Sequence, residues 1–127
     1  MRLHRRPIHF LPKVVTALKS NGLSSFPILI LERSELFGHG SLVTVFYVDQ
    51  NGIELQVGNG QVSTVQMDRR IQVEVTHWAV AHQNIFDGMA ANLADTLCRL
   101  LVKPTVTSGS IESGVFRRIG DVAEEEN

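Results

Sequence analysis

The chain has 127 residues, about the length of one domain, and is 43% hydrophobic and 20% charged. This composition is typical of a globular protein and is too apolar for wholesale disorder. Twelve basic and 13 acidic residues give a net charge of -1, which excludes polyanion binding through total charge but not through a local basic patch. The single cysteine, Cys98, excludes an intramolecular disulfide framework and a cysteine-based zinc cluster. No apolar run reaches the ~18 residues of a membrane span, so we expect a soluble protein of a reducing compartment without a membrane partner.

The two ends of the chain carry opposite charges, which divides the sequence into a basic arm (1–9), a single domain (10–119) and an acidic tail (120–127). Prolines and polar residues interrupt any apolar signal segment after the first arginines, so we expect the arm to stay uncleaved. Charged ends are usually solvated, but in a ring of identical subunits they can contact neighbours, and the sequence leaves both alternatives open. We predict that at least one end contacts another subunit or a partner through its charge cluster: Arg2, Arg5 and Arg6, or Glu124, Glu125 and Glu126.

The first predicted element is an amphipathic helix over residues 11–20. Its apolar residues recur at the i, i+3, i+4 and i+7 positions of one helical face, and Asn21-Gly22 supplies a stop. The segment 26–31 is then predicted to be a short buried strand, with Pro27 at its start or on a sheet edge. The apolar positions of the helix are Leu11, Val14, Val15 and Leu18.

A block without helical periodicity follows from residue 41. Ser41–Val48 is dense in β-branched and aromatic residues, and Asn51-Gly52 after it is the strongest short signal for a hairpin. Apolar and polar residues alternate over 53–57, which predicts the partner strand. Gly58-Asn59-Gly60 is interpreted as a second turn, before a weaker strand over 61–66.

A further strand with one solvated face is predicted over residues 70–78, where apolar and polar residues again alternate. We expect His77 to continue the buried face of this strand and His82 to lie in the following loop. The two histidines are five residues apart, with no carboxylate or cysteine to complete a metal set. No catalytic, cofactor-binding or metal-binding residue is therefore predicted, and the sequence does not favour an enzyme.

The best helical pattern extends from Asn84 to Lys103, and Pro104 ends it. We expect Leu93 and Leu97 to be fully buried in its apolar stripe and Cys98 to be a small buried hydrophobe at the edge of that stripe. A short last strand is predicted at 115–119. The stripe consists of Phe86, Met89, Ala90, Leu93, Leu97, Leu100 and Leu101.

This order of elements predicts an α+β fold. The expected sheet is antiparallel with about four to five strands, and the N-terminal helix and the long late helix pack on one of its faces. Clusters of arginines also keep an alternative function open, a small nucleic-acid-associated binding module that uses its N-terminal basic arm. The clusters are Arg2, Arg5 and Arg6, then Arg69 and Arg70, then Arg117 and Arg118.

The layout of residues 10–102 resembles a known family. Arg69–Trp78 is a basic, alternating strand that ends in an aromatic residue, and a connector leads to a helix that ends with Leu93–Val102. Upstream lie the N-terminal helix, the Phe26-Pro27 strand and the hairpin. This arrangement is similar to that of the lambda-type tail terminator and tail-completion proteins of long-tailed bacteriophages.

The resemblance implies a small structural protein of a phage virion without catalysis or cofactor. Its subunits would form a homohexameric ring in the tail or neck, which terminates the tail tube and joins the tail to the head-side connector. The implied partners are further copies of the chain, the tail tube protein and the connector proteins, with nucleic acid only passing through the ring lumen. The ring would assemble in the host cytoplasm. On this hypothesis the subunit or partner interface includes Arg2, Arg5, Arg6, Asp49, Asn51, Arg69, Arg70, Glu124, Glu125 and Glu126.

Overall fold

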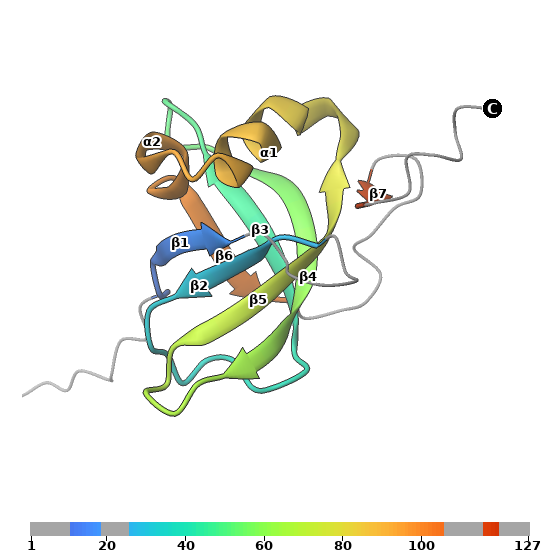
Figure 1. Cartoon of the computed structure of the whole chain (residues 1–127). Helices are drawn as coiled ribbons and strands as arrows, with labels where there is room; N and C mark the ends of the chain where they lie inside the picture. Colours follow the sequence, from blue (N-terminus) through green and yellow to red (C-terminus); the bar gives the residue numbers. More distant parts are fainter. Residues whose placement is uncertain (1–10, 19–25, 106–115, 120–127) are drawn as a thin grey trace, which may run out of the picture.

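The computed structural model describes residues 11–18, 26–105 and 116–119, and its main feature is one antiparallel sheet (Figure 1). The strands follow in the spatial order β1-β2-β5-β4-β3-β6, and β7 pairs with the last residues of β5. The strands are β1 (Val14–Leu18), β2 (Ile28–Leu31), β3 (Leu42–Val48), β4 (Glu54–Val65), β5 (Ile71–Ala79), β6 (Leu100–Pro104) and β7 (Phe116–Arg118). The helical segments are a 3-10 turn η1 (Val80–His82), α1 (Gln83–Ala90) and α2 (Ala94–Leu97).

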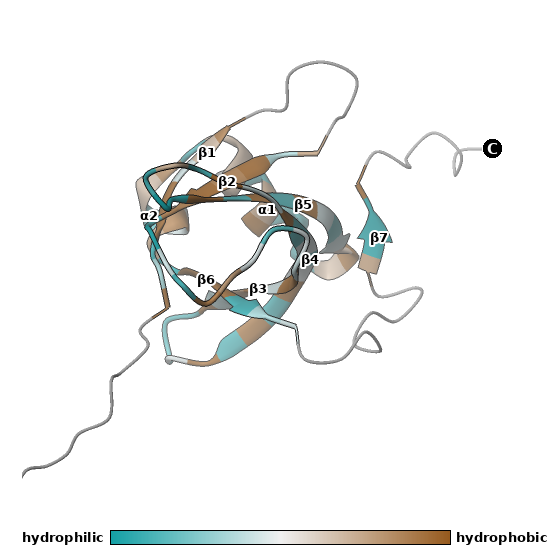
Figure 2. Cartoon of the chain, turned by 90° about the horizontal axis from the view of Figure 1, so that it is seen from below, coloured by the Kyte–Doolittle hydropathy of each residue, from teal (hydrophilic) through white to brown (hydrophobic). Residues whose placement is uncertain are grey.

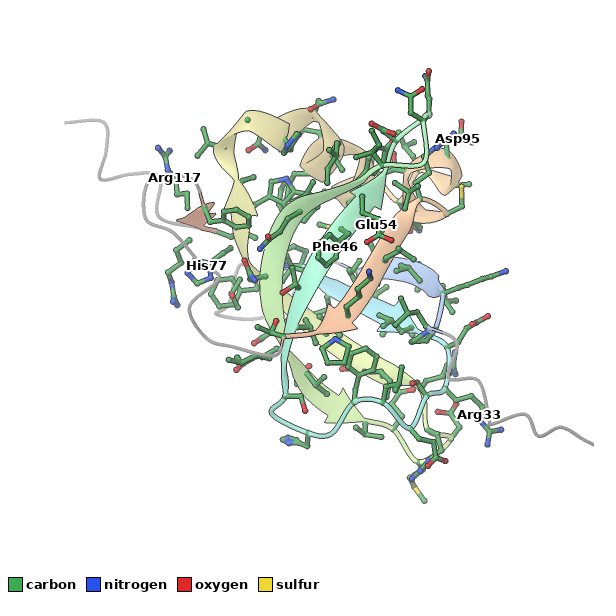
Figure 3. All side chains as sticks on the ribbon, turned by 180° about the vertical axis from the view of Figure 1, so that it is seen from behind. Arg33, Phe46, Glu54, His77, Asp95 and Arg117 are labelled. Atoms are coloured by element: carbon green, nitrogen blue, oxygen red, sulfur yellow. The ribbon has the colours of Figure 1, made fainter. Side chains whose placement is uncertain are left out.

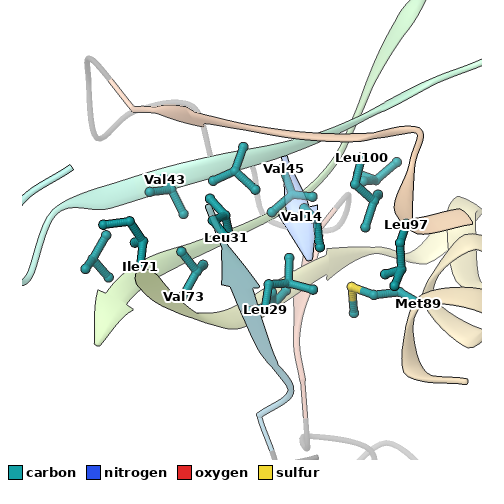
Figure 4. Close-up of a cluster of buried hydrophobic side chains, with 14 of the residues drawn as sticks. Val14, Leu29, Leu31, Val43, Val45, Ile71, Val73, Met89, Leu97 and Leu100 are labelled. Atoms are coloured by element: carbon teal, nitrogen blue, oxygen red, sulfur yellow. The ribbon is translucent and has the colours of Figure 1, made fainter. Parts of the chain in front are cut away.

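The sheet curls into a half-barrel around its own core, as the view from below in Figure 2 shows. Alternate residues of the strands point inward, because successive side chains of a strand face opposite sides. Figure 4 shows that Met89 of α1 and Leu97 of α2 join this core, so the helices close one end of the half-barrel. The strand residues with no exposed surface are Leu29, Leu31, Val43, Val45, Val57, Ile71, Val73, Val75 and Val102.

The long strand β4 contains the Gly58-Asn59-Gly60 segment, so the predicted second turn is wrong. Neither glycine has room for a side chain beside β5. A Cβ atom on Gly58 would lie 2.6 Å from a ring carbon of Trp78, and one on Gly60 would overlap the carbonyl oxygen of Glu74. The pairing register also shifts here, between Asn59 and Gly60, as at a β-bulge. Close packing of two strands, and not a turn, therefore requires these glycines.

Most of the predicted strands are confirmed. The β3–β4 hairpin turns at Asn51-Gly52, where Gly52 has a φ of 78°. The Asp49 carboxylate accepts hydrogen bonds from the N–H groups of Asn51 (2.8 Å) and Ile53 (3.0 Å), which stabilises the turn. Strands β2 and β7 lie within their predicted ranges, and β5 extends one residue beyond its own, to Ala79.

The predicted N-terminal helix is wrong, because these residues form the edge strand β1. Val14, Val15 and Thr16 are β-branched and favour an extended backbone, and the edge of β2 supplies hydrogen-bond partners. The four apolar positions fit a helical spacing, but they do not form one buried face. Val15 is 49% exposed and Leu18 is 48% exposed.

The predicted late helix is also wrong, because three separate elements occupy its range. Asn92 adopts the left-handed conformation (φ 61°) just after α1. Its Oδ1 accepts hydrogen bonds from the backbone N–H of Ala17 (3.0 Å) and the hydroxyl of Thr16 (3.3 Å), which fixes the break against β1. After α2 the chain extends again, because residues 100–104 pair along the edge of β3.

The break changes the environment of two side chains that we expected to be buried. Leu97 does lie in the core, with 7% of its surface exposed, whereas Leu93 is 53% exposed. Cys98 is exposed as well, and its thiol donates to the carbonyl oxygen of Asp95 at 3.3 Å. The expectations for Leu93 and Cys98 are therefore wrong.

The predicted fold class, an α+β sandwich with a helical layer on a sheet of four to five strands, is contradicted. The described sheet has seven strands, and α1 and α2 have only eight and four residues. A curled antiparallel sheet covers its own inner face, so it needs helices only at its open end. Strand β1 replaces the predicted N-terminal helix, and α1, α2 and β6 divide the range of the predicted late helix.

Truncating the two leucines tests this correction. We expect Leu97→Ala to lower the free energy of unfolding by about 2–5 kcal/mol, because it leaves a cavity between α2 and the sheet. Leu93→Ala should cost about 0.5 kcal/mol or less, because its side chain is already half in solvent. Urea denaturation of the two variants measures both values. Equal, large losses would instead indicate a continuous buried stripe.

Candidate functional site

Four of the predicted interface residues lie in two turns at opposite ends of β4 (Figure 1). Asp49 and Asn51 belong to the β3–β4 turn, whereas Arg69 and Arg70 belong to the β4–β5 turn. The structure does not bring the two pairs together. The other six, Arg2, Arg5, Arg6, Glu124, Glu125 and Glu126, lie outside the described residues.

The side chains in these turns have local partners. Asp49 stabilises its own hairpin, as described above. Arg69 forms an ion pair with Glu35 (3.1 Å), and Arg70 forms one with Asp68 (2.9 Å). All four of these charged side chains are about half exposed or more, so each pair contributes little to stability. Neither turn presents unpaired arginines for a partner.

A more distinctive feature is the junction of the two edge strands, β1 and β6. The curl of the sheet brings them close to each other, but they are not paired. Between them and α2 lies a groove of about 550 Å³, which we call the seam. Most of its lining is apolar. The seam residues are Leu11, Pro12, Lys13, Val14, Val15, Asn92, Ala94, Leu97, Cys98, Leu100 and Leu101.

Peptide groups on the outer side of β6 face the seam. The Thr105 N–H donates to Leu42 (2.9 Å) and the Val48 N–H donates to Arg99 (2.9 Å), which fixes the alternation of the β3–β6 ladder. Since only every second residue of an edge strand bonds to its neighbour, Val102 directs its N–H and C=O away from β3. Among the described strands, none pairs with this edge.

Two residues limit how much of the seam is open. Pro104 has no N–H, so it ends the hydrogen-bonding edge of β6. On β1, the Ala17 N–H points toward the seam and is already bonded to Asn92. The open stretch is therefore short and lies between Val15 and Val102. An extended segment with apolar side chains can lie along this stretch and pair with the edge of β6, as in strand addition.

The side chains that line the seam are suited to binding an apolar segment. Lys13, which precedes β1, and Cys98, which follows α2, are its only titratable side chains among the described residues. Across the described parts of the chain, no group of three or more His, Cys, Asp or Glu side chains could hold a metal ion. His77 does not continue the buried face of β5 as expected, because Trp78 is the inward residue (4% exposed).

None of the described interface candidates lines the seam, so sequence reasoning missed it. Val15 and Leu101 are far apart in the sequence and meet only because the sheet curls. One local signal was present: the consecutive β-branched residues Val14, Val15 and Thr16 favour a strand over a helix. No comparable signal marks strand β6, because residues 100–101 also fit the apolar pattern of the predicted late helix.

The β4–β5 turn allows a test of its charge pairing. The backbone N–H of Arg70, followed by its guanidinium, holds the pKa of the Asp68 carboxyl below its ordinary value of 3.8. Because the pKa is lowered in the folded state, this stabilisation is present at neutral pH and is lost as the pH falls through the folded-state pKa.

We expect Arg70→Gln to raise the Asp68 pKa without returning it to 3.8, because the backbone bond remains. Carbon-13 NMR titration of the carboxyl group measures the change. Arg69→Gln is the control and should have no effect, since Arg69 pairs with Glu35. An unchanged midpoint in Arg70→Gln would contradict the assigned pairing.

Comparison with known proteins assigns this chain to no family. No family description, no curated protein and no solved structure matches this chain. Among the described residues, no helix is both long enough and apolar enough to cross a bilayer.

Proposed function

We propose that this chain is a non-enzymatic structural subunit that assembles with further copies of itself through the seam between β1 and β6. The observation that carries the proposal is an apolar groove of about 550 Å³ beside a strand edge that no described strand pairs. Open edges of this kind bind extended chains, and proteins that do not use them normally protect them. Here Pro104 and Asn92 protect only the two ends of the open stretch.

The segment that fits the seam best is the basic arm (1–9) of a neighbouring copy. The arm of each copy ends close to that copy's own seam, because Leu11 and Pro12 line the groove. An arm can therefore reach the seam of a second copy that lies next to it. The arm includes apolar residues, Leu3 and Ile8, among its arginines. Asp95 is exposed in the first turn of α2 (Figure 3) and follows Ala94, which lines the groove, so its carboxylate is a candidate partner for those arginines.

An arm that binds the next copy makes a head-to-tail contact. Such heterologous contacts close into a ring when the rotation between copies allows it. The ring that terminates a phage tail tube, implied by the sequence resemblance, is one assembly of this type. That resemblance depended on an N-terminal helix, which is strand β1, and on one long late helix, which is divided into α1, α2 and β6. The seam, and not the resemblance, therefore supports the proposal.

The nucleic-acid alternative has less support in the described residues. Arg69 and Arg70 are both paired with acidic side chains, which reduces their availability to phosphates. No specific observation favours this function over assembly.

Light scattering coupled to size-exclusion chromatography tests assembly. We expect the full chain to form oligomers whose mass rises with concentration, and Val15→Glu to shift it to the monomer. Val15 is 49% exposed, so a charge there should not prevent folding. Ile53→Glu is the matched control, since Ile53 is 54% exposed but lies in the β3–β4 turn. A full chain that stays monomeric up to its solubility limit would contradict the proposal.

Two truncations identify the inserted segment. Deleting residues 1–9 should abolish assembly, whereas deleting 121–127 should preserve it. Circular dichroism confirms that each variant is folded. Assembly that survives loss of the arm but not Val15→Glu would show that another segment fills the seam.

A further inference from the structure

A row of polar residues crosses the outer face of the sheet, on the side away from the core. Cross-strand pairing aligns one residue from each of five neighbouring strands, and paired residues share a face of the sheet. Their inward neighbours, such as Val43 and Val75, belong to the core. The row consists of Lys103 on β6, Thr44 on β3, Asn59 on β4, His77 on β5 and Arg118 on β7.

A pocket of about 290 Å³ lies along this row, separate from the seam. Apolar groups at its sides include Phe26, which precedes β2, and Leu42 of β3. Polar groups come from three members of the row, Asn59, His77 and Arg118, and from the bulge in β5, where the Thr76 hydroxyl lies 2.9 Å from His77 Nδ1. Figure 3 shows His77 on the outside of the sheet. The pocket therefore combines apolar walls with several polar groups, which is typical of small-molecule sites.

Asn59 is the unusual member of the row. Its side chain lines the pocket and only 4% of the residue is exposed, yet its Oδ1 has no hydrogen-bond partner. Its Nδ2 donates to the Thr44 hydroxyl at 3.3 Å. Reversing the amide would leave Nδ2 without a partner, so one amide atom stays unpaired in either orientation. Buried polar groups in proteins are nearly always paired, so this unpaired atom is the candidate contact for a bound molecule.

Threonine hydroxyls beside Asn59 leave one proton to donate. Thr44 Oγ1 and Thr105 Oγ1 are 2.7 Å apart, and one of their two protons forms that bond. Thr105 lines the pocket, and when Thr44 donates in this bond the Thr105 proton is available to a ligand oxygen. Asn59 and the threonines therefore present an acceptor and a donor side by side.

Arg118 supplies the charge at the other end of the pocket. Its guanidinium lies over the Phe26 ring, 5.0 Å from the centroid, and it forms no ion pair with a described residue. Stacking on the ring positions the guanidinium, whose N–H groups can bind a carboxylate.

We infer that this pocket binds a small carboxylate that carries an N–H group next to it, either a free amino acid or the C-terminal residue of a peptide. The carboxylate binds Arg118, and the apolar side chain packs on Phe26 and Leu42. The N–H donates to Asn59 Oδ1, which the free protein shields from solvent, so binding must first shift the groups that cover this atom. This function is independent of the assembly proposed for the seam, because the pocket lies on a different surface.

Two-dimensional NMR titration of the full chain tests the inference. The probes are leucine, N-acetyl-leucine, leucinamide, and a tetrapeptide that ends in leucine with a free or an amidated carboxyl group. We expect the carboxylate probes to shift the Asn59 side-chain amide signals, and the amidated probes to bind at least tenfold more weakly. Binding of leucine but not of the tetrapeptide identifies free amino acids as the source, and the reverse identifies peptide C-termini.

Variants separate a built site from general charge attraction. Arg118→Gln should reduce affinity at least tenfold, whereas Arg33→Gln, which removes an exposed arginine away from the pocket, should leave it unchanged. Asn59→Leu should abolish binding without lowering the thermal midpoint, because it removes an unpaired buried amide. No shift with any probe at millimolar concentration, or equal effects of Arg118→Gln and Arg33→Gln, would overturn the inference.

Discussion

The close approach of β4 and β5 at Gly58 and Gly60 is the constraint on which the rest of the structure depends. β4 and β5 can pair in this way only because Gly58 and Gly60 have no side chain on the inner face of the sheet. A Cβ atom at either position would overlap Trp78 or the carbonyl oxygen of Glu74. The accompanying bulge, with Thr76 as its extra residue, bends β5 and lets the sheet curl instead of lying flat. Trp78 then occupies the space over Gly58, and its indole N–H bonds to the carbonyl of His82 (2.8 Å), which positions η1 over the end of the half-barrel.

The curl has two consequences at a distance. It brings β1 and β6 together, although they are the first and last strands in the spatial order. It also lets one sheet enclose most of the core, so the short helices fill only the remaining opening. Asn92 connects these effects, because the left-handed residue that ends α1 also binds the edge of β1. The result is a seam whose backbone edge is protected at both ends, by Asn92 and Pro104, and open between them.

The same bend shapes the outer surface. Asn59 lies between the two glycines, so the residue that faces outward at the bend is polar while its neighbours have no side chain. The bulge places Thr76 and His77 on the outer face close to it, with the Thr76 hydroxyl 3.4 Å from the Asn59 carbonyl. The same bulge therefore determines both the packing on the inner face of the sheet and the polar row on its outer face. The seam and the pocket differ in chemistry, since one offers peptide edges and the other a charge and an unpaired amide.

The sequence by itself determined the features that depend on neighbouring residues. Alternation identified β5, the Asn51-Gly52 pair identified the hairpin, and Pro27 marked the start of β2, because turn geometry and strand faces follow from local sterics. Only the tertiary structure decided whether residues 14–18 and 100–104 form helices or strands. Each fits a helical spacing, but a free edge of β2 or β3 supplied hydrogen bonds that extended the chain. Asn59 and Val15 could not be identified as site residues from the sequence, because the seam and the pocket form between strands that are distant in the chain. A run such as Gly-Asn-Gly has the same local appearance in a turn and in a tightly packed strand, and only the neighbouring strand distinguishes the two.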